Sequence, residues 1–130
     1  MTRVQIKISA KKSEVIMGYS HVNTKMGCTV FLDNKEYRYI SKQVNTTFEA
    51  LRIIARDRMI ISMQGSLYLA KVNFNSIKNF SESDFYIQNV KRYIYDAKKN
   101  RDFLNADSLY NREFNRLFKG KIKSLKKVSA

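Results

Sequence analysis

Residues 81–101 have the sequence SESDFYIQNVKRYIYDAKKNR, in which apolar side chains recur with the period of an α-helix. The apolar positions fall at i, i+4, i+7, i+8 and i+11, namely Tyr86, Val90, Tyr93, Ile94 and Ala97. This spacing places them in one stripe along a helix, and such a stripe normally faces a core. The stretch therefore predicts an amphipathic helix in which Val90 and Ile94 are buried.

A second helical stripe follows after the pattern breaks at DFLNADS (102–108). Its apolar members are Tyr110, Phe114, Leu117, Phe118, Ile122 and Leu125. At about 100° per residue, several cations cluster on the opposite side of this helix. They are Arg112, Arg116, Lys119, Lys123 and Lys126. We therefore expect a final amphipathic helix with a basic ridge, in which residues 119–130 form a basic helix end or tail.

The N-terminal part of the chain alternates between apolar and polar side chains, as half-buried strands do. VQIKISA (4–10) places its valine and isoleucines on one face, and EVIMGYSHV (14–22) is interpreted as a second strand. CTVFLDNKEYRYIS (28–41) contains two strand-like runs around a short polar loop, which is typical of a hairpin. These stretches predict an antiparallel β-meander.

The middle of the chain begins with a helix signal, because Thr46 and Glu49 form a capping-box pattern. MIISMQ (59–64) and LYLAKV (67–72) then flank Gly65, and both are short and rich in β-branched or aromatic residues. We predict two strands there, with a helix as the alternative for the second. The predicted fold class is α+β: an N-terminal antiparallel β-meander with one inserted helix, followed by two C-terminal amphipathic helices, in a single domain over 1–130.

The order of these elements allows a second interpretation. Three strands, a helix carrying Glu49 and a strand ending in MQGSLYL resemble the first half of a ribonuclease H-like α/β fold, over roughly residues 3–70. That family holds divalent metal with a carboxylate on its first strand, a Glu on its first helix and an Asp after its fourth strand. Here the first strand has no acid and Gln64 stands at the place of the Asp. The resemblance therefore implies a degenerate fold without the metal site.

The charge of the chain narrows the class of partner. Lys and Arg number 25 against 11 acids, which gives a formal net charge of +14 and a pI of about 10.0. An excess of this size favours an acidic partner, and nucleic acid is the commonest, ahead of anionic membrane and acidic protein surfaces. No apolar run is long enough to span a bilayer and the N-terminus lacks the pattern of a signal peptide, so we expect a cytoplasmic protein.

The residues that usually carry catalysis or hold metals are scarce. Cys28 and His21 are each the only residue of their type, so neither a disulfide within the chain nor a zinc site of several Cys or His ligands is expected. We expect no cofactor, no metal and no catalytic residue. His21 as the general base of a small metal-independent ribonuclease is the least favoured hypothesis.

Two further sets of residues are candidates for binding nucleic acid. The helix over 81–101 carries a basic cluster made of Lys91, Arg92, Lys98, Lys99 and Arg101. In the hairpin, Tyr37 and Tyr39 alternate with Arg38, so both rings lie on one face of a strand and could stack on unpaired bases. The alternative is that the two rings lie on the core side of the sheet.

We therefore expect a small, basic, non-enzymatic protein that contacts the backbone phosphates of RNA or DNA. A second hypothesis is a modulator encoded by a phage or mobile element, which binds an acidic surface of a host protein such as RNA polymerase or a nuclease. Residues with AT-rich codons are plentiful, which suits such a source. The sequence leaves open the type of nucleic acid, the number of its strands and the oligomeric state.

Overall fold

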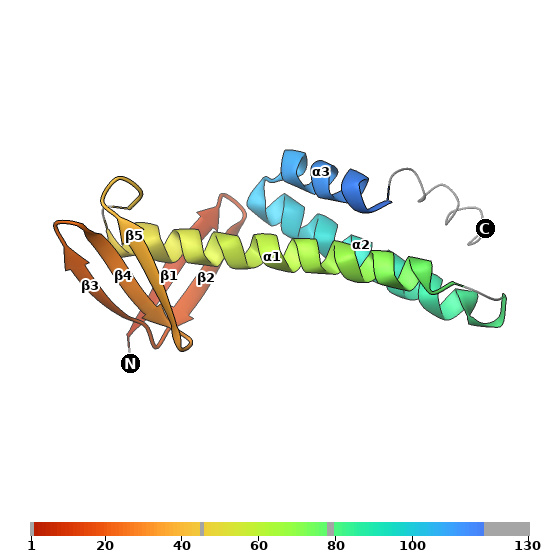
Figure 1. The fold of residues 1–130 in the computed structure, drawn as a ribbon, viewed down its shortest axis with the longest axis horizontal. Helices are drawn as coiled ribbons and strands as arrows, with labels where there is room; N and C mark the ends of the chain where they lie inside the picture. The colour runs from red at the N-terminus through yellow and green to blue at the C-terminus, as the bar shows by residue number, and fades with distance from the viewer. Residues whose placement is uncertain (1, 45, 78–79, 119–130) are drawn as a thin grey trace. The chain divides into compact units, whose positions relative to one another are not determined.

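The computed structural model of the chain describes residues 2–44, 46–77 and 80–118, apart from the side chains of 80–83. Within these residues five strands precede three helices, so the predicted α+β class is confirmed (Figure 1). The chain divides into two compact units, Met1–Arg58 and Met59–Ala130, and helix α1 (Thr47–Asn75) crosses the boundary. The single domain over 1–130 stays a prediction, and each unit is described by itself.

The strands lie in the first unit and form two antiparallel sheets. Strand β1 (Arg3–Ser9) pairs with β2 (Lys12–Met17), whereas β3 (Ser20–Thr24), β4 (Gly27–Leu32) and β5 (Lys35–Ile40) pair in chain order. The predicted antiparallel meander is therefore confirmed.

Turn residues explain where these strands end. The single strand predicted over 14–22 is wrong, because the chain turns at Gly18, which has a φ of 70°, and β3 begins after it. Asp33 and Asn34 join β4 to β5 with φ values of 52° and 63°, and consecutive positive φ values are what a two-residue type I′ hairpin turn requires. The predicted hairpin is thus confirmed.

The first turns of α1 complete the core of this unit. The buried apolar residues come from both sheets and from α1, and they include Ile6, Ile8, Ile16, Cys28, Val30, Leu32, Ala50, Leu51, Ile54 and Ala55. The predicted cap is present, because the Thr46 hydroxyl accepts the backbone N–H of Glu49 at 3.2 Å. Asn23 Nδ2 donates to the Thr47 hydroxyl at 3.1 Å, and Arg58 forms an ion pair with Asp33. These contacts hold the beginning of α1 against the β3–β5 sheet.

The strands predicted over 59–64 and 67–72 are wrong, because this segment continues α1 without a break through Gly65. The helix given as the alternative for 67–72 is confirmed. The short runs rich in isoleucine and leucine imitate strands, but the buried positions follow a helical period. They are Met59, Met63, Leu67 and Ala70, spaced by four, four and three residues. A Cβ added to Gly65 would meet no atom within 4 Å, so this glycine is an exposed helix residue and not a break.

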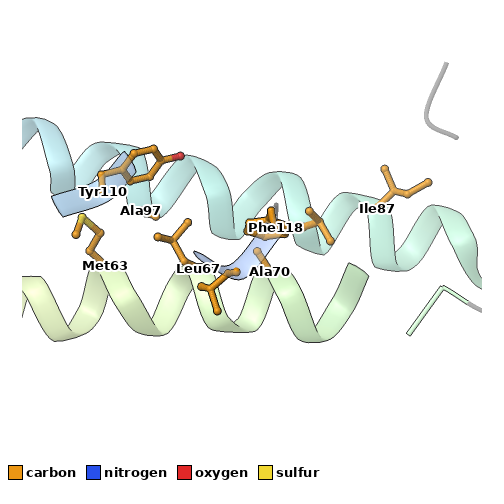
Figure 2. Close-up of a cluster of buried hydrophobic side chains, with 9 residues drawn as sticks. Met63, Leu67, Ala70, Ile87, Ala97, Tyr110 and Phe118 are labelled. Atoms are coloured by element: carbon orange, nitrogen blue, oxygen red, sulfur yellow. The ribbon is translucent and has the colours of Figure 1, made fainter. Parts of the chain in front are cut away.

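In the second unit the C-terminal half of α1 packs against α2 (Phe80–Leu104) and α3 (Asp107–Phe118). Figure 2 shows Met63, Leu67 and Ala70 of α1 facing side chains of α2 and α3 across an apolar core. Two hydrogen bonds join α1 to α2, from Asn100 Nδ2 to the Ser62 hydroxyl at 3.3 Å and from Asn89 Nδ2 to Asn73 Oδ1 at 3.0 Å. The earlier α1 residue, Ser62, bonds to the later α2 residue, Asn100, and Asn73 bonds to Asn89, so α1 and α2 are antiparallel.

The helices predicted over 81–101 and after 108 are confirmed within the described residues. The predicted burial of Val90 is confirmed, and Ala97 of the same stripe is also fully buried. The predicted burial of Ile94 is wrong, because this residue is half-buried at the edge of the core. Asn105, with a φ of 53°, makes the predicted break between α2 and α3. The part of the last stripe beyond Phe118 lies outside the described residues.

The ribonuclease H-like alternative does not agree with this topology. The strand expected to end in MQGSLYL is part of α1, so Gln64 is a helix residue. The sheets of the described chain pair only in antiparallel fashion. The chain therefore has an antiparallel meander followed by helices and not the first half of an α/β fold.

Candidate functional site

The outward side of α2 gathers cations around an exposed tyrosine. Lys91, Arg92, Lys98 and Lys99 are all exposed, and we call these four residues the α2 basic face. Tyr95 lies at the centre of this face, with cations three and four residues before it and after it. At about 100° per residue, all four cations fall within about 60° of Tyr95 around the helix axis, and they span about 12 Å along it. The face forms because the opposite stripe of α2 is buried in the core of the second unit.

The cations of the α2 basic face have no acidic partner within the described residues. Asp96 is four residues after Arg92 and three before Lys99, spacings at which ion pairs commonly form on helices, yet it pairs with neither. The Arg92 guanidinium lies 5.1 Å from the centroid of the Tyr93 ring, and Lys99 Nζ lies 5.9 Å from that of Phe103. These ring contacts carry no negative charge, so among the described residues no carboxylate neutralises the four cations.

Arg101 was predicted as part of the same cluster, but its contacts differ. Its guanidinium pairs with Asp102 at 2.8 Å and with Asp107 at 3.3 Å, and it lies 5.1 Å from the centroid of the Tyr110 ring. Only 26% of its side chain is exposed. Arg101 therefore ties the end of α2 to the beginning of α3, and two carboxylates already neutralise its charge.

The predicted ridge on α3 is also partly neutralised. Arg116 donates two hydrogen bonds to Glu113 Oε2, at 3.1 Å from Nε and 2.8 Å from Nη2, and Arg112 Nε lies 4.0 Å from Glu113 Oε1. Glu113 is the buried acid of α3, so Arg116 stabilises a carboxylate that has left water. The rest of the predicted ridge, Lys119, Lys123 and Lys126, lies outside the described residues.

The hairpin residues proposed as base readers occupy two different faces of β5. Tyr37 pairs with Val30 and Tyr39 with Cys28, and both rings are half-buried on the face that carries these two buried residues. Burial, supported by the charge of Asp57, raises the pKa of the Tyr39 phenol. This placement favours packing over base stacking for both rings. Arg38 is on the opposite face and pairs with Glu36 at 3.1 Å.

The first unit contains a hollow of about 300 Å³ beside His21. The His21 ring stacks on Tyr19 with centroids 6.2 Å apart, and the other lining residues are Asn23, Thr46, Thr47, Phe48 and Leu51. None of these lining residues is a carboxylate, a lysine or an arginine. A general base here would therefore lack both a second acid–base group and a cation for phosphate, and the ribonuclease hypothesis gains no support from this hollow.

Tyr95 is the functional candidate that the sequence interpretation missed. Its signal was present as an aromatic residue flanked at three and four positions on both sides by lysine or arginine. The structure adds that the ring is 66% exposed, whereas Tyr93 on the same helix is half-buried. The spacing of the cations therefore identifies the position in the sequence, and the structure shows that the ring at this position is exposed.

Other classes of site find no counterpart in the part of the chain that the structure describes. No cluster of three or more His, Cys, Asp or Glu side chains that could hold a metal ion occurs there. None of the described helices combines the length and the apolar content that crossing a membrane requires. No family model matches the chain, and no similar protein was found among curated proteins or solved structures.

Proposed function

We propose that the protein binds nucleic acid and that the α2 basic face contacts the phosphate backbone. The observation that carries this proposal is the set of four exposed cations, side by side on one helix, that have no acidic partner among the described residues. Elsewhere in the second unit, arginines pair with nearby acids, as Arg101 and Arg116 do. Like charges held close together repel one another. Binding a polyanion would reduce this repulsion more than water alone does.

The geometry of the α2 basic face suits contacts with backbone phosphates that do not depend on the base sequence. The cations lie along the helix axis over about 12 Å, a length that covers several phosphates of one strand. Lysine and arginine side chains are long and flexible enough to follow a backbone, and their contacts position a protein without selecting bases. The proposal is therefore binding to RNA or DNA of any sequence, with no chemical step.

The dependence of oligonucleotide affinity on salt concentration tests the proposal quantitatively. Four phosphate contacts on a single strand contribute a log–log slope of about 2.8, which corresponds to a loss of about 50-fold in affinity between 50 and 200 mM salt. We expect the K91Q/R92Q/K98Q/K99Q variant to lose this part of the slope when binding to a labelled random oligonucleotide is measured by fluorescence anisotropy. Glutamine is a good helix former, so circular dichroism should show that the helices are retained.

A matched control separates the α2 basic face from total charge. Lys7, Lys11, Lys25 and Lys42 are exposed lysines of the first unit, and K7Q/K11Q/K25Q/K42Q removes the same four charges from the formal net charge of +14. The control should keep the slope of the parent. Equal losses in both variants would contradict a localised site. Absence of any binding to oligonucleotides would contradict the proposal and leave the acidic protein surface as the better hypothesis.

A further inference from the structure

Tyr95 is an exposed aromatic ring in the centre of the α2 basic face. Its exposed fraction is 66%, and within the described residues the ring makes no contact with another ring or cation and no hydrogen bond. Nearby rings differ, because Tyr93 packs against the core and lies under Arg92. Packing among the described residues therefore does not explain a tyrosine at position 95.

The neighbours of Tyr95 define what can approach its ring. Lys91 and Arg92 precede it by one helical turn, and Lys98 and Lys99 follow by one turn. An anion held by these cations therefore lies about one helical turn from Tyr95 along the helix. A nucleotide carries its phosphate and its base on one sugar, so phosphates on either side of Tyr95 bring a base to the ring. Every base has a π-face, and stacking on tyrosine does not depend on base identity.

Resting on the proposed function, we infer that Tyr95 stacks on an unpaired base, so that the α2 basic face binds single-stranded nucleic acid in preference to duplex. In a duplex the faces of each base are covered by the neighbouring base pairs, so Tyr95 can reach only sugar and phosphate. In a single strand the bases can turn outward and stack on an aromatic side chain. The cations can contact phosphates of both single strands and duplexes, whereas the Tyr95 ring can stack only on a base of a single strand.

The test compares three variants on a random single-stranded oligonucleotide and on its duplex, at one salt concentration. Removal of one stacking ring weakens binding to a single strand by about 5- to 150-fold, so Tyr95→Ala should show a loss in this range and less than about 2-fold loss on the duplex. Tyr95→Phe retains a stacking ring and should bind as the parent does. Tyr68→Ala is the matched control, because Tyr68 is 58% exposed on α1 and Lys71 is the only cation within four residues of it.

The outcomes distinguish this inference from the proposal on which it rests. If Tyr95→Ala binds single strands as tightly as the parent, while K91Q/R92Q/K98Q/K99Q loses affinity, stacking is wrong and phosphate binding stands. An equal loss on both probes, or an equal loss for Tyr68→Ala, also contradicts stacking. If the quadruple variant binds both probes as the parent does, the proposed function itself is wrong.

Discussion

Two leucines on α1 test the continuous helix over 59–72, where the sequence predicts two strands with a helix as the alternative for the second. Leu67 is fully buried in the core of the second unit, whereas Leu69, only two residues later, is 42% exposed. Leu→Ala removes three carbons, or about 2.4 kcal/mol of transfer free energy at a fully buried site, and the cavity raises the total to about 3–5 kcal/mol. At Leu69 the same change costs no more than about 1.4 kcal/mol and opens no closed cavity.

The unequal costs follow from helix geometry. Residues two apart point to different sides of a helix but to the same face of a strand, so a strand predicts similar losses at both positions. Urea unfolding followed by far-ultraviolet circular dichroism gives the free energies of unfolding for the parent, Leu67→Ala and Leu69→Ala. With a slope of about 1.5 kcal/mol/M, Leu67→Ala should lower the midpoint by about 2 M or more. A difference between the two variants below about 1 kcal/mol would refute the helix register.

Two further substitutions test single positions. Gly65→Ala should raise the free energy of unfolding by up to about 1 kcal/mol in the same urea assay, because alanine is the better helix former and its Cβ meets no atom within 4 Å; a loss would contradict the exposed position. Tyr110→Phe should be as stable as the parent or more stable by about 1 kcal/mol, because its buried hydroxyl has no hydrogen-bond partner among the described residues. Burial raises the pKa of Tyr110, although the charge of Arg101 opposes this shift. The folded state therefore favours the protonated phenol, and the parent loses stability as the pH rises above the unfolded pKa of about 10. The advantage of Tyr110→Phe should therefore grow in urea titrations above pH about 10, and a constant difference would contradict the raised pKa.

The elements that the sequence predicts correctly carry local signals. Asp33 and Asn34 tolerate the positive φ values of a tight hairpin, and the Thr46 hydroxyl satisfies a free N–H at the beginning of α1. The stripe through Val90 and Ala97 has a single helical period. Each of these features depends on residues close together in the chain, so the pattern alone is sufficient.

The segment 59–75 could not be assigned in this way, because short runs of isoleucine and leucine suit both a strand and a buried helix. Its conformation depends on partners far along the chain, such as Asn100, which bonds to Ser62, and Phe118, whose ring lies 6.5 Å from that of Phe74. Gly65 added a misleading break signal. The spacing of four and three residues through Met63, Leu67 and Ala70 is the feature of the sequence that indicates a helix.

The candidate site was predictable in part. Composition and helical spacing identified the cations of α2, but only side-chain placement separates Lys91 and Lys98, which have no acidic partner among the described residues, from Arg101 and Arg116, which pair with acids. The role of Tyr37 likewise depends on which face of β5 meets the core. Sequence spacing cannot decide that without knowing which face of the sheet α1 covers.

Lysine footprinting by mass spectrometry tests the central claim most directly, because it reports on every lysine of the unaltered chain in one experiment. The protein is acetylated briefly with and without a single-stranded oligonucleotide at low salt, and the reactivity of each lysine is compared. The α2 basic face predicts that Lys91, Lys98 and Lys99 become protected, whereas Lys7, Lys11 and Lys42 keep their reactivity. Unchanged reactivity at Lys91, Lys98 and Lys99, with protection elsewhere or nowhere, would contradict the proposed interface.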